Sequence, residues 1–133
     1  MSLLKTIEMF QELKGYMGAG VFRPDGKMIA GVTEVSGINF EIAGSIFHDT
    51  YLIANNNTKE VGFGSAHMLQ INADTGVVFF KCHRDEEVHF HTILVVNNSA
   101  NISMAKAMLK KVIAELKLEL QPAPKPYPGK LKE

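Results

Sequence analysis

We predict a β-hairpin for the stretch Gly15-Tyr-Met-Gly-Ala-Gly-Val-Phe-Arg-Pro-Asp-Gly-Lys-Met-Ile-Ala-Gly-Val-Thr33. Its strands cover 16–22 and 28–33, and residues 23–27 form the turn. Proline presets φ for the second position of a turn, and Gly26 supplies a positive φ without steric cost. Gly18 and Gly20 leave one face of the first strand almost bare, which indicates that another backbone approaches closely. We expect the helix that precedes the hairpin to cross that face.

The composition is that of an ordinary globular protein. Hydrophobic residues make up 46% and charged residues 21% of the 133 residues, which allows one domain with a proper core. Lys plus Arg and Asp plus Glu both number 14, so no broad positive electrostatic field attracts nucleic acid or an anionic membrane.

The single cysteine, Cys82, excludes an internal disulfide and fits a reducing compartment. The N-terminus has no signal-peptide pattern, and no apolar run approaches the roughly 20 residues that span a bilayer. We therefore expect a cytoplasmic protein.

Helical and strand patterns alternate around the hairpin. We predict helices at 2–14, 36–56 and 101–120, and three further strands at 66–73, 77–82 and 88–96. Ser2 and Ser36 are candidate N-caps, and Asn55–Asn57 is a candidate stop for the second helix. The order α-β-β-α-β-β-β-α predicts an α+β sandwich with a five-stranded antiparallel sheet. We assign 1–120 to one domain and 121–133 to a proline-rich tail, because its prolines exclude helix and central strand.

The second predicted helix is apolar on more than one side. One stripe contains Phe40, Ala43, Phe47, Tyr51 and Ala54, and three isoleucines broaden it: Ile42, Ile46 and Ile53. Such a helix is expected to bury two faces. One face would pack on the sheet, and the other would lie either in a deeper core or against a partner.

One group of residues has the chemistry of a metal site. His89 and His91 alternate along a strand and therefore share one face. If the hairpin closes about residues 85 and 86, Cys82 lies opposite His89, and a thiol and two imidazoles converge as ligands for zinc, iron or copper. His83 and His67 are further candidate ligands. The alternative is that these histidines only line the polar face of a strand, because short motifs of this kind discriminate weakly.

No catalytic motif accompanies this group. The sequence has no Gly-x-Ser-x-Gly elbow, no His-Glu-x-x-His and no Cys-x-x-Cys. A lone strand cysteine is usually a small buried hydrophobe, and the glycines of the hairpin lack the context of a phosphate-binding loop. We expect no enzymatic activity and no organic cofactor.

The order of elements, together with the hairpin, resembles the Roadblock / dynein-light-chain domains. The segment from Tyr16 to Gly31, with its small-residue strand, Pro24-Asp25-Gly26 turn and apolar return strand, is similar to their second element, and the likeness covers roughly 1–120. The resemblance implies a profilin-like three-layer fold, no catalysis, and homodimers or heterodimers formed through the second helix and third strand. It also implies partners such as small Ras-like GTPases or scaffold complexes.

Transferred to this chain, the resemblance implies an interface on Ser36–Asn56 and Ala66–Ala73. We expect the following residues to form it: Phe40, Ala43, Ile46, Phe47, Thr50, Tyr51, Met68, Gln70 and Asn72. The histidine strand and the proline-rich tail depart from the family pattern. We identify neither an arginine finger nor a water-positioning glutamine that would act on GTP, so a GTPase-activating role is not assigned.

Overall fold

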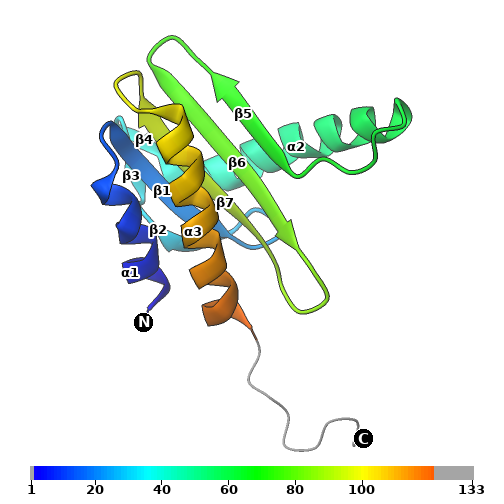
Figure 1. Cartoon of the computed structure of the whole chain (residues 1–133), viewed down its shortest axis with the longest axis horizontal. Helices are drawn as coiled ribbons and strands as arrows, with labels where there is room; N and C mark the ends of the chain where they lie inside the picture. Colours follow the sequence, from blue (N-terminus) through cyan, green and yellow to red (C-terminus); the bar gives the residue numbers. More distant parts are fainter. Residues whose placement is uncertain (1, 122–133) are drawn as a thin grey trace, which may run out of the picture.

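The computed structural model describes residues 2–121, and these form a five-stranded antiparallel sheet with helices on both faces (Figure 1). The first helix and the last lie on one face, and the second helix lies on the other. The helices are α1 (Leu3–Glu8), continued by the 3₁₀ turn η1 (Met9–Glu12), then α2 (Ala43–Glu60), preceded by η2 (Phe40–Ile42), and α3 (Ile102–Leu120). The predicted α+β class is confirmed. The proline-rich segment lies outside the described residues, except for Gln121.

The sheet has the strand order β2-β1-β7-β6-β5, so that β2 and β5 are its edges. Its strands are β1 (Tyr16–Phe22), β2 (Met28–Gly31), β5 (Met68–Asn72), β6 (Gly76–Arg84) and β7 (His89–Asn97). A small separate hairpin, β3 (Glu34–Val35) with β4 (Ile38–Asn39), lies between β2 and α2. The sequence did not predict this hairpin, and its turn and β4 occupy residues assigned to the start of the second helix.

The first hairpin forms at the predicted turn, although its second strand ends at Gly31 and not at residue 33. A different neighbour than expected explains its glycines. Arg23 and Lys27 close the turn through a backbone bond of 2.8 Å, and Gly26 adopts a φ of +96°. A Cβ added at Gly18 would collide with the side chain of Val35, in β3. The expectation that the first helix crosses this face is therefore wrong. That helix packs on the opposite face, where Ala19 is fully buried.

Each face of the sheet has its own apolar core. On the α1 and α3 face, the core includes Phe10, Phe79, Phe90, Leu94 and Leu116. On the α2 face, a smaller core contains Phe22, Phe40, Tyr51, Phe80, Cys82 and Ile93. Because side chains alternate between faces along a strand, β6 and β7 contribute to both cores. The smaller core is the one that the candidate site adjoins.

The second helix differs from its prediction at both ends. Ser36 and Gly37 adopt positive φ values in the β3–β4 turn, so a helix cannot start there, and Asn39 instead caps η2 by accepting the Glu41 N–H at 2.9 Å. The three asparagines do not end the helix, which continues to Glu60. Asparagine lowers helix propensity only modestly, and the Asn55 side chain accepts the backbone N–H of Ala66 at 2.8 Å. The predicted boundaries 36–56 therefore shift to 43–60.

The C-terminal half of α2 extends past the edge strand β5 (Figure 1). From Leu52 onward no residue of the helix is buried, and Ile53 is 64% exposed. None of the helices within residues 2–121 is both long and apolar enough to cross a bilayer. The overhang of α2 leaves apolar side chains without a covering layer in the single chain.

Candidate functional site

The structure brings Cys82, His89 and His91 together on the α2 face of β6 and β7. One potential ligand atom from each residue lies within 4.8 Å of the other two. The Cys82 Sγ and the His89 Nε2 are 3.6 Å apart. The thiol and the two imidazoles therefore meet in space.

The strand register that produces this meeting differs from the one assumed from the sequence. Cys82 lies opposite His91, and Arg84 lies opposite His89. The assumed pairing of Cys82 with His89 is wrong by two residues, because the Asp85 carboxylate accepts the N–H groups of Glu87 and Val88 and moves the turn toward the C-terminus. An even shift keeps every side chain on its face, so the three residues still converge.

His91 is the most enclosed member of the group. It is 1% exposed, and its ring lies between Phe80, at 4.9 Å between centroids, and His48 of α2, which stacks on it at 5.3 Å. Within residues 2–121, neither ring nitrogen of His91 has a hydrogen-bond partner. Buried polar atoms are nearly always paired, so this ring lacks an interaction that its surroundings would normally supply.

The electrostatic surroundings keep both strand histidines neutral near pH 7. Burial, followed by the nearby His89 and His48, lowers the pKa of His91 to about 4. Burial, followed by the positive charge of Arg84, lowers the pKa of His89. Burial, followed by the neighbouring Cys82 side chain, raises the pKa of Tyr51 to about 12. Neutral imidazoles carry a free lone pair, which is the form that binds metals.

The outer side of α2 forms a second candidate site. Ile42, the last residue of η2 before the first turn of α2, and Ile46 and Ile53 of α2 fall within about 40° of one another, at about 100° per residue. They are 50%, 53% and 64% exposed, whereas Tyr51, on the opposite side, is buried and stacks on Phe80 of β6. We call these three residues the isoleucine stripe. The sequence reasoning included only Ile46 in its interface set, although helical spacing alone groups all three.

The residues predicted for the interface fall into three different places. Phe40, Ala43 and Tyr51 are buried, and Phe47 is half-buried against the same core, so they hold α2 on the sheet. Ile46 and Thr50 are exposed on the outside of α2. Met68, Gln70 and Asn72 pair with β6 residues that face α3, so they lie on the sheet face opposite α2. Edge-to-edge pairing of β5 with a second chain would bring residues from both faces into one interface.

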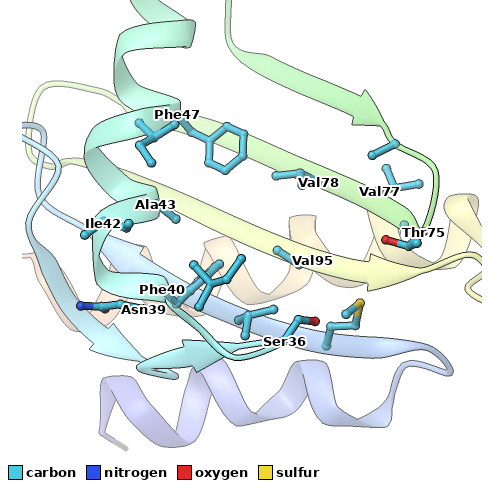
Figure 2. Close-up of a pocket in the computed structure, with 16 residues that line it drawn as sticks. Ser36, Asn39, Phe40, Ile42, Ala43, Phe47, Thr75, Val77, Val78 and Val95 are labelled. Carbon is cyan, nitrogen blue, oxygen red and sulfur yellow. The ribbon is translucent and has the colours of Figure 1, made fainter.

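An apolar pocket of about 320 Å³ opens between the start of α2, the β3–β4 hairpin and the ends of β6 and β7. Figure 2 shows Ile42, Ala43 and Phe47 of the helical segment across from Val78 and Val95 of the sheet. None of its sixteen lining residues carries an ionisable side chain. General acid–base chemistry needs such a group in the pocket, so this pocket offers only apolar contacts and a few hydroxyl or amide groups.

The architecture defines an α+β domain with one five-stranded antiparallel sheet between two helical layers. No protein-family model matches the sequence, and a search of curated proteins finds no match. Solved structures do match. A Roadblock/LC7 domain from Streptomyces avermitilis gives a TM-score of 0.76 at 10% identity, covering 90% of this chain and 98% of that one. The predicted Roadblock-like fold is therefore confirmed.

Two structures of MglB show the same likeness. Myxococcus xanthus MglB gives a TM-score of 0.73 at 10% identity, covering 86% of this chain and 90% of that one. MglB in a tetrameric arrangement gives 0.73 at 13% identity, covering 86% and 84%. At these identities the likeness establishes the fold, and the surfaces of this chain have to be interpreted from its own residues.

Proposed function

We propose that this protein is a non-catalytic adaptor that forms a homodimer through α2 and β5 and, as a dimer, binds a regulatory protein such as a small Ras-like GTPase. The observation that carries the proposal is the isoleucine stripe, three large apolar side chains aligned on the outer side of a helix. Scattered exposed apolar residues are ordinary, but an aligned set on one helix is typical of an interaction surface. The apolar pocket beside Ile42 and Ile46 extends that surface.

The edge strand β5 supports self-association. Its sequence, Met-Leu-Gln-Ile-Asn, contains neither a charged residue nor a proline. Natural edge strands are usually protected by such residues. The other edge, β2, is contacted by α1, whereas β5 has a free outer side within the described chain. A second copy that pairs along β5 would extend the sheet, and the two-fold axis would place both α2 helices on the same face.

The relatives in fold agree with this proposal, since one of the MglB structures is itself an assembly of several chains. The absence of ionisable groups from the apolar pocket also favours a binding role over a catalytic one. The partner class is inferred from the Roadblock resemblance. A direct test is calorimetric titration of the dimer with Ras-like GTPases of the host in their GDP and GTP-analogue states. Heat from neither nucleotide state would remove that partner class.

Self-association is tested with Ile46→Glu, measured by size-exclusion chromatography with light scattering. About half of Ile46 is exposed, so its removal loses roughly 1 kcal/mol of apolar burial per copy, or about 2 kcal/mol in a symmetric dimer. That loss alone weakens the dimer about 30-fold, and the buried carboxylate adds to it. We expect a folded monomer at concentrations at which the unmodified protein is a dimer.

The matched control is Met104→Glu, which makes a similar change at an exposed apolar residue of α3. It should leave the dimer intact. A strictly monomeric unmodified protein at high micromolar concentration would contradict the proposal, and so would equal effects of the two variants. Unfolding of Ile46→Glu would show instead that Ile46 belongs to the core, against its 53% exposure.

A further inference from the structure

We propose that Cys82, His89 and His91 bind one transition-metal ion, with zinc as the metal that suits this ligand set. The site lies in the layer between α2 and the sheet. This inference goes beyond the adaptor function and does not depend on it, because it uses the side of α2 that faces away from the isoleucine stripe.

The spacing of the three residues fits the dimensions of a zinc site. Zinc–sulfur and zinc–nitrogen bonds of about 2.3 and 2.05 Å at a tetrahedral angle separate the sulfur and nitrogen ligands by about 3.5 Å. The Cys82 Sγ and His89 Nε2 are 3.6 Å apart. All three ligand atoms lie within 4.8 Å of one another, and His89, the least buried of the three residues, has the most room to adjust its side-chain torsions.

The unpaired nitrogens of His91 provide an independent observation. A neutral imidazole has one donor and one acceptor, and within the described chain both are buried without a partner. Leaving a buried polar atom unpaired costs about 1–3 kcal/mol. If the ring only filled space beside Phe80, an apolar side chain would avoid this cost. A metal ion would bind the lone pair of one of the two nitrogens, a role that an apolar side chain could not fill.

The ligand set indicates which metal fits. One thiolate with two imidazoles is a soft to intermediate set, which suits zinc in a tetrahedral site with one position left for water. Binding replaces the Sγ proton of Cys82, which passes to the buffer, while each imidazole donates a nitrogen lone pair. No electron is transferred in this step, and no further reactant is needed.

Two neighbours of the site, both on α2, pack against the ring of His91. Tyr51 of α2 donates its hydroxyl to the Ala66 carbonyl at 2.9 Å, and its ring lies 5.9 Å from that of His91. His48, also of α2, stacks on the ring of His91, with 5.3 Å between the ring centroids. These ring contacts restrict the orientation of the His91 imidazole by packing. The site is therefore held between two rigid elements, a helix and a strand pair.

The test uses the full chain without an affinity tag, stripped with a chelator and titrated with Zn²⁺ against a competing indicator dye. We expect one ion per chain and, with Co²⁺ in place of Zn²⁺, a thiolate-to-cobalt charge-transfer band. Cys82→Ser should abolish that band. Both Cys82→Ser and His89→Asn should weaken zinc binding by at least about 10–100-fold, because mutating residues that only support the ligands already costs this much affinity in metal sites. Both residues can change without leaving a large cavity, so both variants should fold.

The matched control is His83→Gln, which changes the residue next to Cys82. The pleat places His83 on the α3 face, where it contacts Asp85 at 3.0 Å, so its replacement should leave zinc affinity unchanged. Failure of the folded, unmodified protein to bind Zn²⁺ above the level of the dye control would overturn the proposal. Equal weakening by His83→Gln and Cys82→Ser, or undiminished binding by Cys82→Ser, would overturn it as well.

Discussion

Replacing Gly44 by alanine tests the position of α2 over the sheet. Gly44 lies in the first turn of the helix, and a Cβ added there would collide with the Gly26 carbonyl oxygen and the Phe22 ring. In an unobstructed helix the same change would stabilise by up to about 1 kcal/mol, because alanine has the higher helix propensity. Here the carbonyl belongs to the tight turn of the first hairpin and cannot move without disturbing it.

The collision is expected to exceed the gain in propensity. Overpacking of a well-filled site costs typically about 1–3 kcal/mol and occasionally more, so we expect Gly44→Ala to lower the free energy of unfolding by about 1–2 kcal/mol. Urea denaturation followed by circular dichroism measures this. All samples should have the same protein concentration, since the unfolding of a self-associating protein depends on it.

Ser45→Ala is the control for Gly44→Ala. It alters helix propensity at the next, exposed position without adding a Cβ, and should be neutral or stabilise by a few tenths of a kcal/mol. If Gly44→Ala stabilises the protein by about 1 kcal/mol, the first turn of α2 does not contact the hairpin. The placement of the isoleucine stripe relative to the sheet would then be refuted as well.

Two further predictions concern the α1–α3 side of the molecule. The backbone N–H of Val88, followed by Lys117 and the N–H of Glu87, holds the pKa of Asp85 well below its usual range. The carboxylate therefore stabilises the fold above the pKa of an unfolded aspartate, and this stabilisation is lost as the pH falls below that value. The difference in urea midpoint between the unmodified protein and Asp85→Asn should accordingly shrink between pH 7 and pH 3. Thr6→Val removes a buried hydroxyl that donates to Glu119 at 2.8 Å and should cost about 1 kcal/mol in urea denaturation; no change would show that this α1–α3 bond contributes nothing.

The parts of the fold set by local chemistry could be predicted from the sequence. The Pro24-Asp25-Gly26 turn and the N-cap of Ser2, whose Oγ accepts the Lys5 N–H at 3.2 Å, depend on residues close together in the chain. Apolar segments bounded by turn residues likewise predicted all five strands of the main sheet. These features follow from backbone preferences that hold wherever the residues occur.

The misplaced features depend on contacts between distant segments. The bare face of Gly18 is filled by Val35 of a two-residue strand, too short to leave a periodic pattern. The register of β6 and β7 depends on hydrogen bonds to the Asp85 carboxylate, which a count of loop residues does not reveal. The face occupied by Met68 follows from its pairing with Lys81 of β6, and strand spacing alone does not say which sheet face carries α2.

The two proposals follow from two unsatisfied features on opposite sides of α2: buried ring nitrogens without a hydrogen-bond partner, and exposed apolar side chains. Toward the sheet, α2 presents Tyr51 and His48 to a ring, His91, whose nitrogens have no partner within residues 2–121. Away from the sheet it presents apolar isoleucines. A metal ion can bind a His91 nitrogen but cannot cover the isoleucines, and a second chain can cover the isoleucines but cannot reach His91. Loss of either interaction therefore need not remove the other. The two are nevertheless joined by the rigid helix. Any factor by which zinc tightens the dimer must equal, by thermodynamic reciprocity, the factor by which dimer formation tightens zinc binding.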